Sequence, residues 1–176
     1  DKSKLGANSI LSVSLGVAAA SAAASRVSLF RYLNGLFHQI LPTQLTKIPT
    51  PTVNVINGGK HGAGGLDFQE FQIVPASNFR YSDALRLSVE IYQKLRGILQ
   101  YRNTSTAVGY EGGFAPNLYT NLDAMELLQE AVRATTYRFG VDVFFGLDVA
   151  ASHFKTDRGY QIKDKQTPMN PKDFVE

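Results

Sequence analysis

The sequence predicts an α/β fold in which two strands are followed by two helices and then by a third strand. Three patterns support this prediction: short β-branched or alternating apolar runs at 52–56 and 70–74, apolar residues at helical intervals over 81–99 and 122–137, and a continuous apolar run at 141–149. Because most α/β barrels alternate strand and helix from their first strand, this order would be an unusual opening for a barrel.

The chain begins with two predicted helices. Residues 5–25 are rich in Ala, Leu, Val and Ser, with Leu11 and Leu15 at helical spacing, which predicts a tightly packed helix that is mostly buried. Ser28 is positioned to cap a second, short helix over 29–36.

A segment with three prolines separates these helices from the predicted sheet. The prolines lie between Leu41 and Pro51, where they exclude a continuous helix and favour a boundary or crossover. We therefore expect two parts, residues 1–45 and residues 46–176.

The predicted strands end at residues that interrupt a sheet. Asn-Gly-Gly at 57–59 follows the first strand and adopts positive φ readily, and Pro75 ends the second. The run at 141–149 predicts a strand buried on both faces, and residues 156–159 resemble a hairpin turn.

The two predicted helices after the second strand are amphipathic, with a polar face for solvent. Their apolar positions are Ala84, Leu85, Leu87, Ile91, Leu95 and Ile98 in the first helix, and Met125, Leu128 and Val132 in the second.

Composition excludes several classes of function. The 18 basic and 15 acidic residues are dispersed and leave a formal charge of only +3, so nucleic acid is not expected as a partner. The absence of cysteine excludes disulfides, thiolate metal sites and cysteine nucleophiles, and is compatible with a cytoplasmic location. No run of about 18 apolar residues predicts a membrane span.

A secretory signal is the alternative interpretation of the N-terminal segment. Lys2 and Lys4 precede an apolar stretch at 10–20, as in a signal peptide. Serines at positions 9, 12 and 14 dilute the apolar character, so we favour a helix of the folded protein.

A glycine-rich segment, GGKHGAGG at 58–65, is the first candidate for a binding loop. Exposed backbone N–H groups bind anions, but the segment has neither GxxxxGK[ST] nor GxGxxG spacing, which argues against a nucleotide site. His61 in its centre is a candidate for proton sharing or anion binding, although a single loop histidine is more often without function.

Three carboxylates are candidates for catalysis or metal binding. Glu70 lies in an apolar strand, Glu111 lies between glycines, and Asp148 closes the last apolar run. A buried carboxylate is costly unless it is paired or used, and barrel enzymes place their chemistry at the C-terminal ends of strands. Oxygen ligands without cysteine favour a hard cation such as Mg²⁺.

Five strings give the chain a resemblance to a known family. KLGANSIL, NVINGGKHGAGG, QEFQIVP, GYEGGFAPN and GLDVAASHF occur in the order and approximate spacing found in enolases, and together they extend over essentially the whole chain. The resemblance implies an α/β fold: a partial enolase-type TIM barrel, with its strand-strand-helix-helix opening, over residues 46–176. Residues 1–45 then correspond to the last helices of the N-terminal cap domain and a linker.

The resemblance also implies roles for single residues. His61 is similar to the loop histidine that closes over substrate, and Glu70 and Glu111 to the carboxylates that act on the leaving hydroxyl, with Glu111 closer to the general acid. Gln69 joins His61 and Glu70 as a substrate-binding residue. Asp148 is similar to the first of three acidic Mg²⁺ ligands.

The implied reaction is the reversible, Mg²⁺-dependent dehydration of 2-phosphoglycerate to phosphoenolpyruvate in glycolysis. Sites of the enolase superfamily are a known example in which a lysine or histidine base works with one or two Mg²⁺ ions. The departing hydroxide must be protonated, and like-charge repulsion from a nearby Glu70 would raise the pKa of Glu111.

The chain also differs from the enolase pattern. Tyr110 stands where Asp usually precedes the acid, and Lys60 where Ser is common. The other metal ligands, the lysine base and the phosphate-binding residues of enolases match positions after Glu176, so we expect the isolated chain to be an inactive central fragment of a lyase that forms homodimers. Two alternatives are a catalytically silent enolase-like protein with a binding or structural role, and an anion-binding module on the glycine loop.

Overall fold

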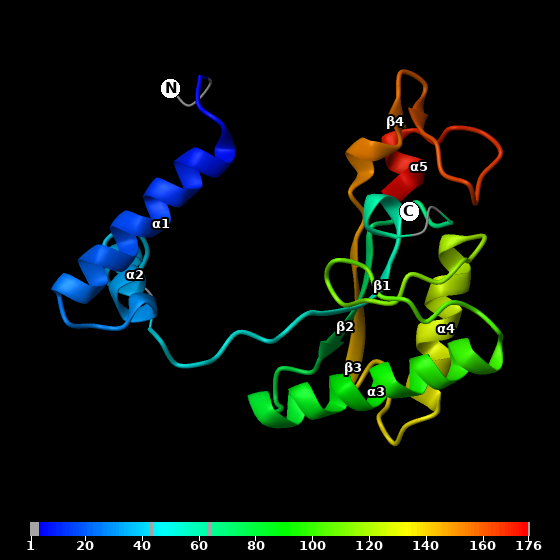
Figure 1. The fold of residues 1–176 in the computed structure, drawn as a ribbon, viewed down its shortest axis with the longest axis horizontal. Helices are drawn as coiled ribbons and strands as arrows, with labels where there is room; N and C mark the ends of the chain where they lie inside the picture. The colour runs from blue at the N-terminus through cyan, green and yellow to red at the C-terminus, as the bar shows by residue number, and fades with distance from the viewer. Residues whose placement is uncertain (1–3, 43, 63–64, 176) are drawn as a thin grey trace. The chain divides into compact units, whose positions relative to one another are not determined.

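The computed structural model describes residues 4–42, 44–62 and 65–175. The chain forms two compact units, Asp1–Ile48 and Pro49–Glu176 (Figure 1). The division follows Ile48, within the proline-containing segment in which the sequence predicts a boundary after residue 45. Lys2 of the signal-like pattern and residues 63 and 64 of the glycine segment lie outside the described residues.

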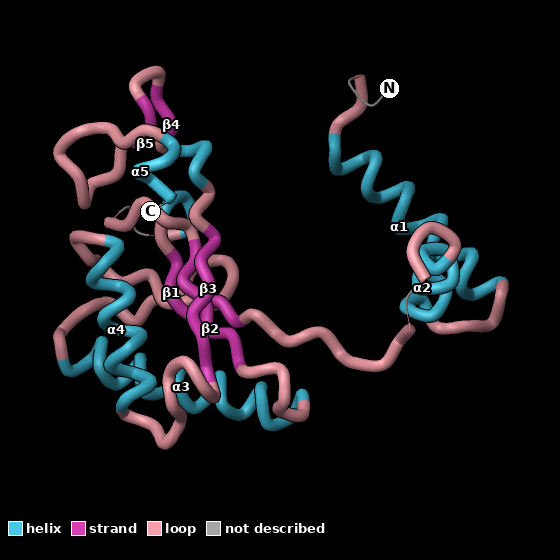
Figure 2. The backbone as a smooth tube through the Cα atoms, turned by 180° about the vertical axis from the view of Figure 1, so that it is seen from behind, coloured by secondary structure: helices cyan, strands magenta, loops and turns pink. Residues whose placement is uncertain are grey.

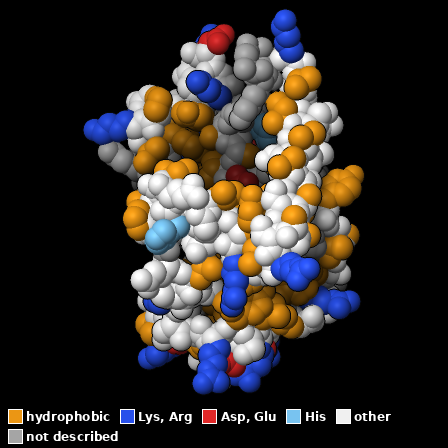
Figure 3. All heavy atoms as spheres, turned by 90° about the vertical axis from the view of Figure 1, so that its left-hand side faces the viewer, with side chains coloured by type: hydrophobic (Ala, Val, Ile, Leu, Met, Phe, Trp, Pro, Cys, Tyr) orange, Lys and Arg blue, Asp and Glu red, His pale blue; other side chains and the backbone are white. Residues whose placement is uncertain are grey.

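The first unit contains α1 (Ala7–Ala24) and α2 (Leu29–His38), close to the two predicted helices. Ser28 precedes α2 in an extended conformation, but its side chain makes no capping hydrogen bond. The prediction that the first helix is mostly buried is wrong, because α2 covers only part of it and Ala22 is its one buried residue among those described. Hydrophobic side chains therefore remain visible at the surface in Figure 3.

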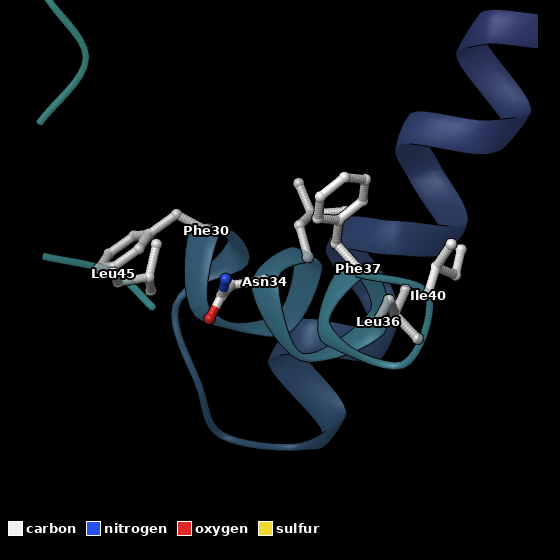
Figure 4. Close-up of a pocket in the computed structure, with 7 residues that line it drawn as sticks. Phe30, Asn34, Leu36, Phe37, Ile40 and Leu45 are labelled. Carbon is white, nitrogen blue, oxygen red and sulfur yellow. The ribbon is translucent and has the colours of Figure 1, made fainter. Parts of the chain in front are cut away.

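The apolar surface of the first unit has two further features. α1 is long and apolar enough to cross a membrane by length and composition, although a single helix of this kind is weak evidence because signal sequences and core helices share these properties. An open apolar groove of about 590 Å³ lies on α2. Figure 4 shows side chains that line it. Its lining residues are Phe30, Leu33, Asn34, Leu36, Phe37, Ile40 and Leu45.

The second unit is built on a three-stranded sheet of β1 (Val53–Asn57), β2 (Glu70–Pro75) and β3 (Val143–Asp148), which lie side by side in Figure 2. The strand order is β1-β2-β3, and β2 runs antiparallel to both neighbours. The predicted strand-strand-helix-helix-strand order is confirmed. The sheet is a partial α/β arrangement, and the described strands do not form a closed barrel.

Two helices cover the sheet and complete the core (Figure 1). α3 (Tyr81–Tyr101) packs against β2 and against α4 (Asn121–Arg133). A capping box between Thr120 and Asp123 starts α4, because each residue's side chain accepts a hydrogen bond from the other's backbone N–H. The fully buried core side chains include Val55, Ile56, Phe71, Ile73, Leu87, Ile91, Leu95, Leu99, Leu128 and Val143.

The third strand is less buried than its apolar sequence predicts. Val143 is its one buried residue among those described, whereas Phe144 is 44% and Leu147 is 42% exposed. The reason is that β3 lies at an edge of the described sheet, with β2 as its only strand partner there.

The C-terminal segment folds back beside the sheet. It contains a short 3₁₀ helix, η2 (Ala151–His153), and a short α-helix, α5 (Pro171–Val175). Between them β4 (Lys155–Thr156) and β5 (Gly159–Tyr160) form a hairpin, which confirms the turn predicted at 156–159. The rings of Phe154, Tyr160 and Phe174 pack together here, and those of Phe154 and Phe174 also contact Phe68 in the loop before β2.

We expect replacement of Leu95 by Ala to destabilise the second unit by about 2–5 kcal/mol, because it removes a fully buried side chain and leaves a cavity. Leu85→Ala on the same helix is the matched control, since Leu85 is 46% exposed and should cost well under half as much. Urea unfolding followed by circular dichroism measures both. Equal losses in the two variants would contradict the described orientation of α3.

Candidate functional site

The candidate site lies where the ends of three strands meet. In the sheet register Asn57 pairs with Glu70, and Glu70 pairs with Asp148. Because β2 is antiparallel to both neighbours, its first residue lies beside the last residues of β1 and β3. The register therefore brings two of the predicted carboxylates, Glu70 and Asp148, to the same end of the sheet, where β1 and β3 finish and β2 begins.

His61 lies at this end of the sheet, in a tight loop that follows β1. The loop contains the short helix η1 (Gly59–His61), and the N–H groups of Gly58, Gly59 and His61 donate to the carbonyls of Gln69, Leu66 and Gly58. A Cβ on Gly58 would lie 2.2 Å from the Phe68 carbonyl oxygen, so glycine is required for this close approach.

This bonding weakens the interpretation of the glycine segment as a phosphate cradle. A cradle needs free N–H groups that point at the anion, but these three are already used within the chain. Residues 63 and 64, which belong to the same segment, lie outside the described residues.

Glu111 is presented by a turn that closes around the side chain of Asn57. The Gly109 N–H donates to the Gly113 carbonyl over 2.8 Å, and Asn57 is only 1% exposed inside the turn. A Cβ on Gly109 would lie 2.4 Å from Asn57 Nδ2, and one on Gly113 would lie 2.1 Å from Asn57 Oδ1. Gly109 and Gly113 are therefore required in this turn, because a side chain at either position would collide with the Asn57 amide.

Asn54 links that amide to the acid. Its Nδ2 donates to Asn57 Oδ1 over 2.7 Å and to Glu111 Oε2 over 3.0 Å. Residues three apart in a regular strand face opposite sides, but a register shift between Asn54 and Ile56 breaks the alternation, so both amides reach the same side.

A second contact holds the turn from the helix side. Tyr92 of α3 stacks on Phe114 with ring centroids 4.2 Å apart, and its hydroxyl donates to the Gly112 carbonyl over 2.7 Å. The Glu111 turn is thus fixed between the amides of β1 and the aromatic pair.

The side chains of His61, Glu70 and Glu111 converge. One ligand atom from each lies within 4.8 Å of the others, and His61 Nδ1 is 3.5 Å from Glu111 Oε2. Gln72 Nε2 also donates to Glu70 Oε2 over 2.8 Å. Sequence elements separated by many residues therefore supply one histidine and two carboxylates to a single cluster.

The two glutamates of the cluster have pKa values shifted in opposite directions. Burial raises the pKa of Glu70, whereas a hydrogen bond with Glu70 is the main cause that lowers the pKa of Glu111. The sequence predicted a raised pKa for Glu111, and this direction is wrong. The reason is that burial favours the protonated form of Glu70, and a hydrogen bond from Glu70 stabilises the Glu111 carboxylate.

The other predicted residues lie around this cluster. Asp148 is exposed, its Oδ1 accepts from the Ala150 N–H over 3.1 Å, and its charge helps to raise the pKa of Glu70. The hydrogen bonds of Gln69 in the described residues are backbone bonds, to Asp148 and Gly58. Tyr110 is 96% exposed, so its side chain points away from the cluster.

The family is decided by comparison with known sequences. The sequence model described as "Enolase, C-terminal TIM barrel domain" matches residues 45–175. The chain belongs to the enolase family. The matched range contains the strands, the helices and every candidate residue of the enolase site described above.

Individual enolases resemble the chain over its whole length. It is 42% identical over 176 residues to the enolases of Ehrlichia chaffeensis and Ehrlichia canis, which covers 100% of the chain and 40% of each relative. The enolase of Ehrlichia ruminantium is 42% identical over 166 residues, or 94% of the chain and 38% of the relative. The chain thus corresponds to part of an enolase and spans about two fifths of the length of these relatives.

The residues at the end of the sheet that holds Glu70 and Asp148 are suited to bind a divalent cation. Asp148 offers exposed carboxylate oxygens beside Glu70, and hard oxygen donors with access to water are what Mg²⁺ requires.

The sequence patterns did not predict a role for Asn54 and Asn57 in the site. Two amides in an otherwise apolar strand were the available signal, since buried polar groups need partners.

We expect the pKa of Glu111 to rise when Glu70 is replaced by Leu, because the replacement removes the hydrogen-bond donor that stabilises the Glu111 carboxylate. Glu70→Gln is the matched control, since its amide retains a donor and should keep the pKa of Glu111 below the ordinary value. Carboxyl ¹³C NMR titration measures both. A lower pKa in Glu70→Leu would show that charge repulsion dominates instead.

Gly113→Ala should disturb the Glu111 turn, because its methyl group would collide with Asn57 Oδ1. The expected loss of stability is about 1–3 kcal/mol. Gly97→Ala in α3 is the control, since nothing lies within 4 Å of its added carbon and alanine favours a helix. Urea unfolding distinguishes the two, and an unchanged Gly113→Ala variant would show that Asn57 does not fill the turn.

Proposed function

We propose that the chain supplies part of the active site of an enolase-type lyase, which dehydrates 2-phosphoglycerate reversibly to phosphoenolpyruvate in glycolysis. The observation that carries the proposal is the convergence of His61, Glu70 and Glu111 beside Asp148. Family membership supports the reaction class, and the local geometry supports the proposed roles of the side chains.

The two glutamates are suited to handle the leaving hydroxyl. Hydroxide is a poor leaving group, so it must receive a proton as it departs. The raised pKa of Glu70 favours the form that carries a proton, and Glu70 shares a hydrogen bond with Glu111. Transfer of this proton from Glu70 to Glu111 would let the exposed Glu111 act as the general acid that family resemblance assigns to it.

The remaining residues position and complete this pair. Asn54 holds Glu111 by its Nδ2, and Gln72 holds Glu70. His61 lies in a loop beside the pair, where it would contact the substrate, and Gln69 lies next to Glu70. Asp148 would help to hold Mg²⁺, which would supply positive charge to stabilise the charge that develops on the substrate.

We place the activity in a protein of full family length, and we expect it to be cytoplasmic and homodimeric. The isolated chain should not convert substrate, because by family resemblance it contains one of the three metal ligands and lacks the lysine base. The alternative function is a silent enolase-like protein with a binding role, which the change at Tyr110 motivates. Because Tyr110 is 96% exposed and outside the cluster, we favour the enzyme.

A chimera tests the proposal. The 176 matching residues of Ehrlichia chaffeensis enolase are replaced by this chain, with which they are 42% identical, and conversion of 2-phosphoglycerate is followed by ultraviolet absorbance. We expect Mg²⁺-dependent activity that falls about 10²–10⁴-fold in Glu111→Gln, because the acid is lost. Asp148→Asn should raise the Mg²⁺ concentration needed for half-maximal activity.

His153→Ala is the matched control, because His153 is an exposed histidine outside the cluster. It should retain the activity of the chimera. A folded chimera with no activity would favour the silent alternative, and an active chimera that is insensitive to Glu111→Gln would refute the proposed acid.

A further inference from the structure

The cluster of His61, Glu70 and Glu111 has a ligand chemistry that differs from that of a magnesium site. Mg²⁺ is bound mainly by oxygen atoms and water, whereas an imidazole together with carboxylates suits zinc and similar first-row metals. We propose that these three side chains form a binding site for a divalent transition metal ion, of which Zn²⁺ is the representative. The site would be separate from Asp148 and would need no substrate.

The first support is a buried ring nitrogen of His61 that lacks a well-formed hydrogen bond. His61 Nδ1 is buried and makes no regular hydrogen bond in the described part of the chain, and its 3.5 Å distance to Glu111 Oε2 is too long for a good one. It lies beside the carboxylates of Glu70 and Glu111, whose ligand atoms belong to the same cluster. A cation at the centre would satisfy all three groups.

The second support is the spacing of the ligand atoms. Two ligands about 2.1 Å from a tetrahedral zinc ion lie about 3.4 Å apart. His61 Nδ1 and Glu111 Oε2 are already 3.5 Å apart, and all three ligand atoms lie within 4.8 Å. Small side-chain movements would then complete a three-ligand site with one position open to water, which is the arrangement of many zinc centres.

The third support comes from the groups that surround the ligands. Metal-binding carboxylates are commonly fixed by further hydrogen bonds, and here Gln72 Nε2 donates to Glu70 while Asn54 Nδ2 donates to Glu111. Both carboxylates are therefore oriented before any ion binds.

Such an ion would compete with the proposed reaction. It would occupy the two glutamates that exchange the proton and the histidine that meets the substrate. Zn²⁺ at the cluster should therefore act as an inhibitor, whereas the cation at Asp148 supports activity.

Calorimetric titration of the 176-residue chain with Zn²⁺, in buffer that contains excess Mg²⁺, tests the site. We expect one site whose affinity falls about tenfold or more in His61→Ala and in Glu111→Gln. Glu111 is exposed and lies in a turn, so its replacement should not prevent folding. His153→Ala is the control and should bind Zn²⁺ as the parent chain does. Asp148→Asn removes a charge that acts on Glu70, so it should weaken binding, but less than His61→Ala does.

The ring ¹H and ¹⁵N resonances of His61 give a second measurement, because they should shift on addition of Zn²⁺ and stay unchanged with Mg²⁺. Unchanged affinity in His61→Ala or Glu111→Gln would overturn the proposal. Loss of binding in His153→Ala, or a greater loss in Asp148→Asn than in His61→Ala, would also overturn it, since the ion would then lie elsewhere. None of these outcomes depends on lyase activity, so the proposed function stands or fails separately.

Discussion

The antiparallel pairing of β2 with both neighbouring strands is the constraint on which the site depends. It places Asn57, Glu70 and Asp148 in one row across the sheet, although they lie far apart in the sequence. Side chains alternate along a strand, so a slip of one residue would turn Glu70 to the core face and bring Phe71 to the cluster. The burial of Phe71 and Ile73 against the helices prevents this slip, because it fixes which face of β2 is covered.

An irregularity in β1 places the polar side chains that hold Glu111 beside this row of residues. The register shift between Asn54 and Ile56 sets two amides on one side of the strand, and the Gly109–Gly113 turn closes over Asn57. Hence Glu111 is held by contacts that start in the sheet rather than by the loop alone. The same contacts leave Glu111 exposed and Glu70 more buried, and this difference in solvation separates their pKa values.

Much of the fold follows from local patterns in the sequence, but several features of the site do not. Apolar spacing predicts α3 and α4, and Pro75 marks the end of β2, because these signals act over a few residues. The amide pair of Asn54 and Asn57 depends on a register shift, which no local pattern reveals. The pKa of Glu111 depends on which glutamate is more buried, and the exposure of α1 depends on what packs against it, so both require the tertiary structure.

The register of β2 is the most direct point at which to test this account. Nuclear Overhauser effects between backbone protons of the 176-residue chain report which residues face each other across the sheet. The structure predicts cross-peaks between Asn57 and Glu70 and between Glu70 and Asp148. Cross-peaks that instead pair Phe71 with Asp148 would contradict it, because Glu70 would then point away from His61 and Glu111.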